Sequence, residues 1–487
     1  MNRQAVYKIT FNGVKMIFGY SSIKYLVLFF ALLFLAIALS FHPQDLLSDI
    51  IVFLGLSSVV AFLILKKRKD YFEPIFLFSI YYVFVYIAAL ATYARGFENN
   101  LFISATHFYG DIESVYHNAL FICFLSYLFV LLGYMLFVRK TAVVKPKHIY
   151  GISNSLFLLV ALCLYLIGLL NFIYNVLFLY SGDIVAFYRN ISLRHVDFAQ
   201  GGTTLGYNFM YAGAYMLFVR MLQLNKSFIF TYFLVFLSFA VYASSGRITN
   251  TVFYISSFLM IYYYNRGVFS LNNKFLMVGC LVSFFGVFFY ALRYASSLHY
   301  NNMYDFSSDG LSFFVEFFKG ESLAFFLIDK GNIPNFAVLM KVVDSWGRDI
   351  GYMWGGSLLF PFYGFLSSNL FGLIEMPAVI TKEVWYPHIL GGNLPVTGMG
   401  EMVLNFSIIG FPVGMFMFGV MGAFFRNIFL IKRSNIYLIF FSGFCFFFLI
   451  YPKGEFNNFN LFWMAFPSLV FTLTVFFVRS FSSNGKT

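Results

Sequence analysis

The chain consists largely of long apolar runs separated by short charged segments. A helix of roughly 17–25 apolar residues crosses a bilayer core about 30 Å thick. Twelve runs of about that length occur, at approximately residues 25–41, 47–65, 75–92, 116–138, 155–180, 204–222, 227–243, 249–264, 275–291, 403–425, 435–451 and 460–478. The sequence therefore predicts an all-α, polytopic integral membrane protein with about 12 transmembrane helices.

The composition excludes the main soluble classes. Apolar residues make up 61% of the chain and charged residues 11%, whereas a soluble domain has about 25% charged residues. The four cysteines lie inside apolar runs without CxxC spacing, so neither a disulfide framework nor a zinc site is expected. No acidic cluster suits a divalent cation, and no metal or other cofactor is predicted. The first apolar run has no small-residue cleavage site after it and is interpreted as an anchor.

The charged residues predict which segments face the cytoplasm. With the N-terminus inside, the cytoplasmic segments hold 21 of the 32 Lys and Arg but only Asp70 and Glu73 of the 20 acids. Basic residues accumulate on the cytoplasmic side of membrane proteins, so both termini are expected there. The predicted organisation is a nine-helix membrane part (1–291), a large outer loop (292–402) and three C-terminal helices (403–487).

The outer loop contains three predicted local elements. Leu311 to Phe318 is amphipathic, and Pro334 marks a helix start. The stretch from Tyr352 to Gly372 has no charge and is long enough to span. A crossing there would move the bases that follow residue 425 outside, and Pro361 with four glycines disfavours a regular helix. An interfacial or re-entrant segment is therefore predicted.

Arginines on the predicted outer side are candidate phosphate ligands, because a guanidinium offers a planar fork of donors to phosphate oxygens. Their predicted outer position is an exception to the enrichment of basic residues on the cytoplasmic side. The candidates are Arg189, Arg194, Arg247, Arg293 and Arg348. Arg247 follows Gly246 in a hairpin of a few residues, where it could also extend to lipid headgroups. For the loop arginines the alternative is a pair with a nearby acid, such as Asp349 for Arg348.

The segment that precedes the tenth run supplies candidate bases and sugar-stacking rings. Glu401 is a candidate proton acceptor, although a helix N-terminus alone would also stabilise an acid there. His388 is a competing base, or an ordinary loop histidine. Trp354, Trp385 and Tyr386 could stack on sugar rings or lie at the membrane interface as aromatic anchors.

Three motifs carry a resemblance to a known family. The Gly246-Arg247 hairpin, the segment Gly351–Leu359 and the Pro-Val-Thr-Gly-Met-Gly-Glu sequence that ends at Glu401 resemble those of the Wzy-type O-antigen (oligosaccharide repeat-unit) polymerases. Many members carry Pro-Arg and Lys-Pro after the apolar loop segment. Here Phe365–Leu370 has no base, and Arg348 is the expected substitute.

The resemblance implies a metal-independent, inverting glycosyltransferase of the GT-C type in the bacterial inner membrane. Such an enzyme transfers the growing glycan from undecaprenyl diphosphate to the next lipid-linked unit on the periplasmic face. Arg247 and Arg293 would bind the donor diphosphate, and Arg189 or Arg194 the acceptor's. The implied partners are the lipid-linked oligosaccharides, membrane lipid, and a chain-length regulator and a flippase of the pathway, with no nucleic acid.

Two other functions remain open from the sequence. An O-antigen ligase would share the architecture but typically has a His-Asn-type loop motif, which the sequence at His388 does not resemble. A lipid-linked oligosaccharide flippase or transporter usually places charged residues inside the spans, and the runs here have almost none.

Overall fold

The computed structural model of this chain describes the greater part of the sequence after residue 45. The described residues are 7–11, 14–18, 46–68, 70–99, 101–104, 106–139, 146, 154–189, 205–224, 229–244, 248–266, 333–345, 347–363, 376–387, 395–452, 454, 456 and 458–484. The predicted runs 25–41 and 275–291 and the predicted amphipathic segment Leu311–Phe318 lie outside these residues.

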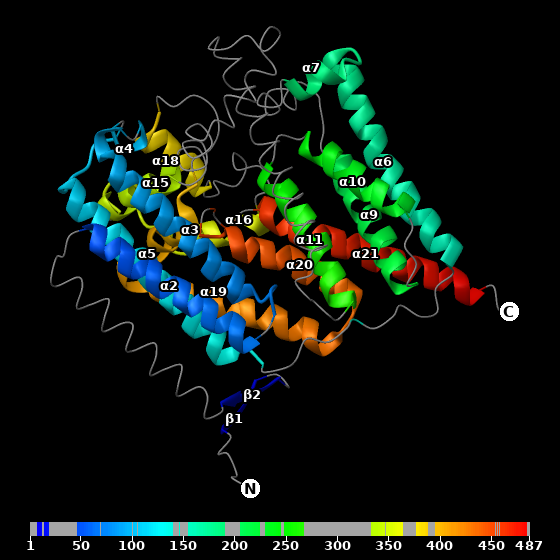
Figure 1. Ribbon diagram of the computed structural model, residues 1–487, viewed down its shortest axis with the longest axis horizontal. Coiled ribbons are helices and arrows are strands. Elements are labelled where there is room, and N and C mark those ends of the chain that lie inside the picture. The colour runs from blue at the N-terminus through cyan, green and yellow to red at the C-terminus, as the bar shows by residue number, and fades with distance from the viewer. Residues whose placement is uncertain are drawn as a thin grey trace. The chain divides into compact units, whose positions relative to one another are not determined.

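Helices dominate the described residues (Figure 1). The exception is a pair of antiparallel strands, β1 (Tyr7–Phe11) and β2 (Val14–Phe18). The helices are α2 (Leu46–Arg68), α3 (Pro74–Arg95), η1 (Phe97–Asn99), α4 (Leu101–Ser104), α5 (Ile112–Phe137), α6 (Asn154–Tyr180), α7 (Ile184–Arg189), α9 (Leu205–Gln223), α10 (Ile229–Ala243), α11 (Ile248–Arg266), α15 (Ile333–Ser345), α16 (Gly356–Tyr363), α18 (Pro377–Trp385), α19 (Thr397–Lys432), α20 (Asn435–Ile450) and α21 (Asn458–Asn484).

Most predicted apolar runs coincide with helices. The runs 47–65, 75–92 and 155–180, for example, correspond to α2, α3 and α6. The helix predicted at Pro334 is found as α15, with the proline in its first turn. The all-α prediction is therefore confirmed for the described residues apart from β1 and β2.

Four of the described helices are long and apolar enough to cross a membrane, namely α3, α5, α6 and α19. Shorter apolar stretches of 10–17 residues lie in four other helices, at Asp49–Ile64, Ile229–Ala243, Asn435–Ile450 and Ala465–Ser480. These helices indicate a membrane-associated protein.

The segment predicted to be interfacial or re-entrant begins with the short helix α16. Its eight residues rise about 12 Å, less than half of the bilayer core. Trp354 and Gly355, with φ of 50° and 85°, turn the chain immediately before it. The Met353 amide donates to the Leu404 carbonyl oxygen at 2.8 Å, so this turn is fixed to α19.

The chain divides into two compact units. Unit 1 comprises residues 1–142, 324–428 and 444–462, and unit 2 comprises 143–323, 429–443 and 463–487. In unit 1, α2, α3 and α5 lie side by side (Figure 1). A Cβ atom on Gly133 of α5 would overlap the Phe416 carbonyl oxygen, and one on Gly419 of α19 would overlap that of Val130. These two glycines therefore let the backbones of α5 and α19 touch.

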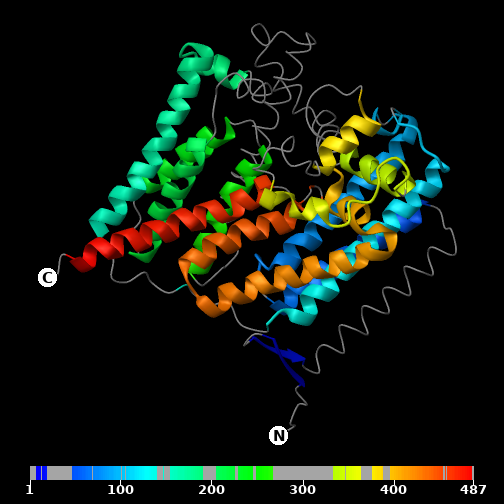
Figure 2. The same cartoon turned by 180° about the vertical axis from the view of Figure 1, so that it is seen from behind.

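Unit 2 is built around α6 and α9, which pack along their length (Figure 2). A Cβ atom on Gly213 would lie 2.6 Å from the Ala161 carbonyl oxygen, so this glycine sets the close approach of the helices. Between α9 and α11, the rings of Tyr215 and Phe258 stack with their centroids 4.6 Å apart. Aromatic packing of this kind accounts for part of the high aromatic content of the chain.

Helix α19 is broken at Ser407, which has φ of 60° and ψ of −179°. Pro412, five residues later, has no N–H to donate to the carbonyl one turn earlier. The first piece, up to Phe406, carries Glu401 and Asn405 and packs against the turn before α16. The break therefore separates a short polar piece from the long apolar remainder of the helix.

Candidate functional site

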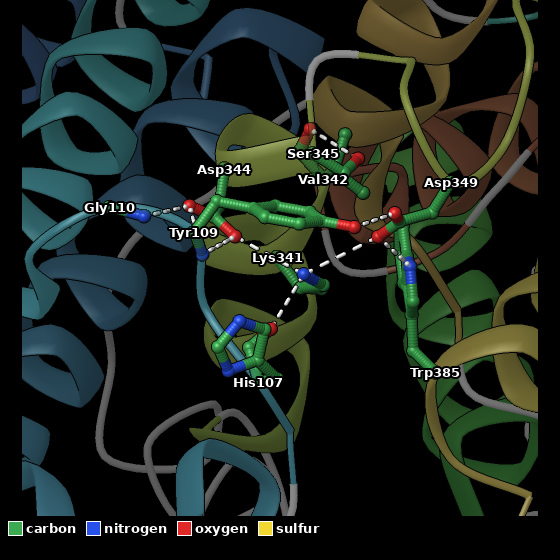
Figure 3. A network of polar contacts seen from close by, with 9 residues as sticks. All are labelled: His107, Tyr109, Gly110, Lys341, Val342, Asp344, Ser345, Asp349 and Trp385. Atoms are coloured by element: carbon green, nitrogen blue, oxygen red, sulfur yellow. Dashed lines mark hydrogen bonds and ion pairs between the residues drawn. The ribbon is translucent and has the colours of Figure 1, made fainter.

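A buried lysine is the centre of a polar network in unit 1 (Figure 3). Lys341 lies on α15, and its side chain is 3% exposed. Its Nζ donates to the His107 carbonyl oxygen at 2.7 Å and lies 3.2 Å from Asp344 Oδ2 and 3.4 Å from Asp349 Oδ2. A buried ammonium group needs such neutralising partners.

Asp344 joins α15 to the loop before α5. Three residues separate it from Lys341 on the helix, so both side chains share one face. Its carboxylate accepts the backbone amides of Tyr109, at 2.9 and 3.1 Å, and of Gly110, at 2.9 Å. The carboxylate therefore holds the 106–110 loop against the helix through charge-assisted hydrogen bonds.

Asp349 links the same loop and α15 to a further element, α18. It accepts hydrogen bonds from the Tyr109 hydroxyl and, at 2.9 Å, from the Trp385 indole nitrogen at the end of α18. Burial alone would raise the pKa of Asp349, but these hydrogen bonds and the Lys341 charge hold the pKa below its ordinary value. The bond to this carboxylate raises the pKa of Tyr109.

Arg348 lies next to this network but is not paired with its carboxylates. The side chain is exposed, and its Cζ lies 5.1 Å from the centroid of the Tyr109 ring. Within the described part of the chain, no carboxylate oxygen lies within 4 Å of its guanidinium nitrogens. The alternative that Asp349 pairs with Arg348 is therefore wrong, because Asp349 binds Lys341, Tyr109 and Trp385 instead.

Glu401 is fully buried in a second polar cluster of unit 1. Its Oε1 accepts the Ser357 hydroxyl at 2.7 Å, and its Oε2 accepts the Tyr451 hydroxyl at 3.0 Å and the Phe456 amide at 2.8 Å. Asn405 donates to the Ser357 hydroxyl at 2.6 Å. The carboxylate thus joins α19 to α16 and to the residues that follow α20, and because it is fully buried a substrate hydroxyl would have to enter the interior to reach it.

The three candidate stacking rings have different environments. Trp354 is 79% exposed and packs edge-on against Tyr352, with ring centroids 6.0 Å apart. Trp385 and Tyr386 are 6% and 0% exposed, and burial raises the pKa of Tyr386 to about 12. Stacking on a sugar by these two rings would therefore require them to leave the interior, whereas Trp354 presents its indole at the surface.

Four candidate residues, His388, Arg194, Arg247 and Arg293, lie outside the described residues. Arg189 ends α7, in unit 2, and its side chain is not described. Among the described residues, no group of three His, Cys, Asp or Glu is placed to hold a metal ion.

A third polar cluster lies at the other end of α5. Arg426 of α19 is 2% exposed, and its Nη2 lies 3.0 Å from Glu73 Oε2 and 3.8 Å from Asp70 Oδ2. Tyr134 of α5 donates to Glu73 Oε1 at 2.9 Å. The charge pattern assigns all three ionic residues to one side of the membrane, and the structure brings them together.

The Lys341 network lies at the opposite end of α5. The ring of Tyr116, near the start of this helix, packs against that of Phe336 on α15, with the ring centroids 5.2 Å apart. Residues 116 and 134 are about 27 Å apart along a helix. The two sets of contacts are therefore separated by nearly the thickness of a bilayer core.

Sequence reasoning selected Arg348, Trp385 and Glu401 and named Asp349 only as a possible partner of Arg348. It missed Lys341, Asp344 and Tyr109. A signal was present, because Lys341 is the single charge in the apolar stretch Phe336–Val343 and an acid follows three residues later. Comparison of the chain with protein-family models, characterised proteins and solved structures finds no match. An assignment of function therefore depends on the residues and their geometry.

Proposed function

We propose that the protein is a membrane glycosyltransferase that polymerises lipid-linked oligosaccharide repeat units. In this proposal it crosses a bacterial inner membrane twelve times in a GT-C-type fold, with both termini in the cytoplasm and residues 292–402 on the periplasmic face. The growing glycan is transferred from undecaprenyl diphosphate to the next lipid-linked unit.

The observation that carries the proposal is the environment of Arg348. Its guanidinium is exposed and lies against the Tyr109 ring, while the adjacent carboxylate of Asp349 is neutralised by Lys341. An exposed arginine usually contributes little to protein stability. Its guanidinium can instead bind an anionic ligand. Arg348 lies at the end of the helices that the charge pattern assigns to the outer face, where a lipid diphosphate headgroup would lie.

The proposed chemistry needs a cation and a base. An acceptor hydroxyl oxygen attacks the anomeric carbon of the donor sugar, the bond from that carbon to the phosphate oxygen breaks, and the electron pair leaves with the diphosphate. Arginines stabilise the departing negative charge, and Arg247 and Arg293 bind the donor diphosphate. Glu401 or His388 accepts the hydroxyl proton.

Deletion of the gene followed by analysis of the surface glycan tests the proposal. A polymerase predicts that the lipid core carries a single repeat unit, because ligation and export continue without chain growth. Complete loss of the repeat unit would instead favour a ligase or a flippase. The Arg247→Ala variant should reproduce the short glycan at normal protein abundance, and chains of normal length would refute the assignment of Arg247.

A further inference from the structure

The Tyr109 ring contacts two cations of different environment. Lys341 Nζ lies 4.4 Å and Arg348 Cζ 5.1 Å from the ring centroid. A cation near the face of an aromatic ring is attracted by the ring quadrupole. The lysine is buried and neutralised, whereas the arginine is exposed. The Tyr109 ring therefore contacts Arg348, the one of these two cations that is accessible to a ligand.

Both ends of Tyr109 are fixed, although the residue is 50% exposed. Its backbone amide donates to Asp344, and its hydroxyl donates to Asp349. Figure 3 shows that both carboxylates converge on the Lys341 ammonium group. A half-exposed tyrosine would otherwise sample several rotamers. The network therefore fixes the position of the Tyr109 ring.

The backbone next to Arg348 is also held. Its own amide donates to the Ser345 carbonyl oxygen at 2.8 Å, which continues the last turn of α15. Gly347, with φ of 80°, makes the turn, and a Cβ there would lie 3.0 Å from the Tyr352 ring. Both the backbone and the ring beneath the guanidinium are thus restrained.

We infer that Lys341, Asp349 and Tyr109 form a positioning network that holds the Arg348 guanidinium ready to bind a phosphate group of an isoprenyl diphosphate. The inference rests on the proposed function and adds the residues that orient its arginine. None of the three needs to contact the ligand. Their contribution is preorganisation, because a long side chain that is already ordered loses less entropy on binding.

A binding titration on the full chain tests this inference. The protein is placed in phosphatidylcholine nanodiscs, and farnesyl diphosphate is titrated as the probe. The Tyr109→Phe variant keeps the ring under Arg348 but removes the bond to Asp349. We expect it to weaken binding roughly 3–10-fold, and Arg348→Ala to weaken binding roughly 10–100-fold. Tyr165→Phe is the matched control, since it removes the hydroxyl bond to the Leu234 carbonyl oxygen in unit 2 and should leave Kd unchanged.

The double variant separates positioning from direct contact. If Tyr109 acts through Arg348, then Tyr109→Phe has no further effect in the Arg348→Ala background. Equal effects in both backgrounds would overturn the inference. So would an unchanged Kd for Tyr109→Phe alongside a weakened Arg348→Ala, an outcome that leaves the proposed function intact. An unchanged Kd for Arg348→Ala would instead refute the role of Arg348 in the proposed function.

Inorganic diphosphate and farnesol distinguish the sources of affinity. The isoprenyl diphosphate should bind more tightly than either, and only the two diphosphates should respond to Arg348→Ala. Equal affinity for inorganic diphosphate would overturn the isoprenyl part of the inference. Lys341→Met should weaken binding at least as much as Tyr109→Phe if the variant folds, and an unchanged Kd in folded Lys341→Met protein would contradict its role.

Discussion

The two ends of α5 in unit 1 use the same residue types to opposite effect. At one end Arg426 is 2% exposed and lies against Glu73 and Asp70. At the other end two aspartates surround Lys341, and Arg348 remains exposed beside them. Each end thus has one buried cation with two acids, and at the second end Arg348 also lies at the surface with no carboxylate partner among the described residues.

The difference shows that proximity in sequence does not decide which charges pair. Asp349 is adjacent to Arg348 but binds the lysine eight positions before it. The reason is burial, since a buried ammonium group gains more from a carboxylate than an exposed guanidinium that water already solvates. The buried clusters are expected to determine stability, and the exposed arginine to determine ligand binding.

The largest effect is expected from Arg426→Ala. Removal of this cation leaves two buried carboxylates without its positive charge, since the Tyr134 hydroxyl that donates to Glu73 is a neutral group, and we expect a loss of about 3–5 kcal/mol in the free energy of unfolding. Thermal unfolding in detergent measures the effect. Lys432→Ala, at the exposed end of the same helix, is the control and should change stability little. A loss below about 1 kcal/mol for Arg426→Ala would contradict the structural role of the cluster.

Lys341→Met is expected to have the next largest effect. The loss should be smaller, about 2–3 kcal/mol, because Asp344 retains two backbone donors and Asp349 retains Tyr109 and Trp385. The same unfolding measurement tests it. Stability equal to that of the unchanged protein would show that the network does not hold α15 to the loop before α5.

A pH effect is expected at the Lys341 end of α5. The pKa of Asp349 is lowered in the folded protein, so its contribution is fully present above the unfolded value, near 3.9. It is lost as the pH falls through the lower folded pKa. The stability of the Asp349→Asn variant, followed between pH 7 and pH 3, should therefore decline less steeply than that of the unchanged protein. An identical slope in the two proteins would contradict a contribution of the Asp349 carboxylate to stability.

The smallest effect on stability is expected from Arg348→Ala. The side chain is exposed and contacts mainly one ring, so unfolding should change by no more than about 0.5 kcal/mol. A loss comparable to that of Arg426→Ala would mean that the two arginines have the same structural role, and the contrast between the ends would disappear.

Much of the fold follows from the sequence because the lengths of apolar runs determine where helices can form. Helices α3 and α6 match the predicted runs closely, and α15 has the predicted proline in its first turn. The break in α19 at Ser407 could not be predicted, because Pro412 suggests a kink farther along. The break depends instead on packing of the first piece against α16.

The site was predictable only in part. Arg348 was selected for its predicted side of the membrane, and its side chain is exposed. Trp385 and Tyr386 were selected for their chemistry, but their burial depends on how α18 packs. Spacing along the chain likewise favoured a pair between Arg348 and Asp349, and only the position of Lys341 shows why it does not form.

Complementation of the deletion strain with Arg348→Ala tests the central claim most directly. The length distribution of the surface glycan is measured at equal abundance of the unchanged and variant proteins. Because the arginine is expected to bind the lipid diphosphate and to contribute little to stability, the account predicts mostly single repeat units from stable protein. Chains of normal length from the Arg348→Ala strain would contradict it.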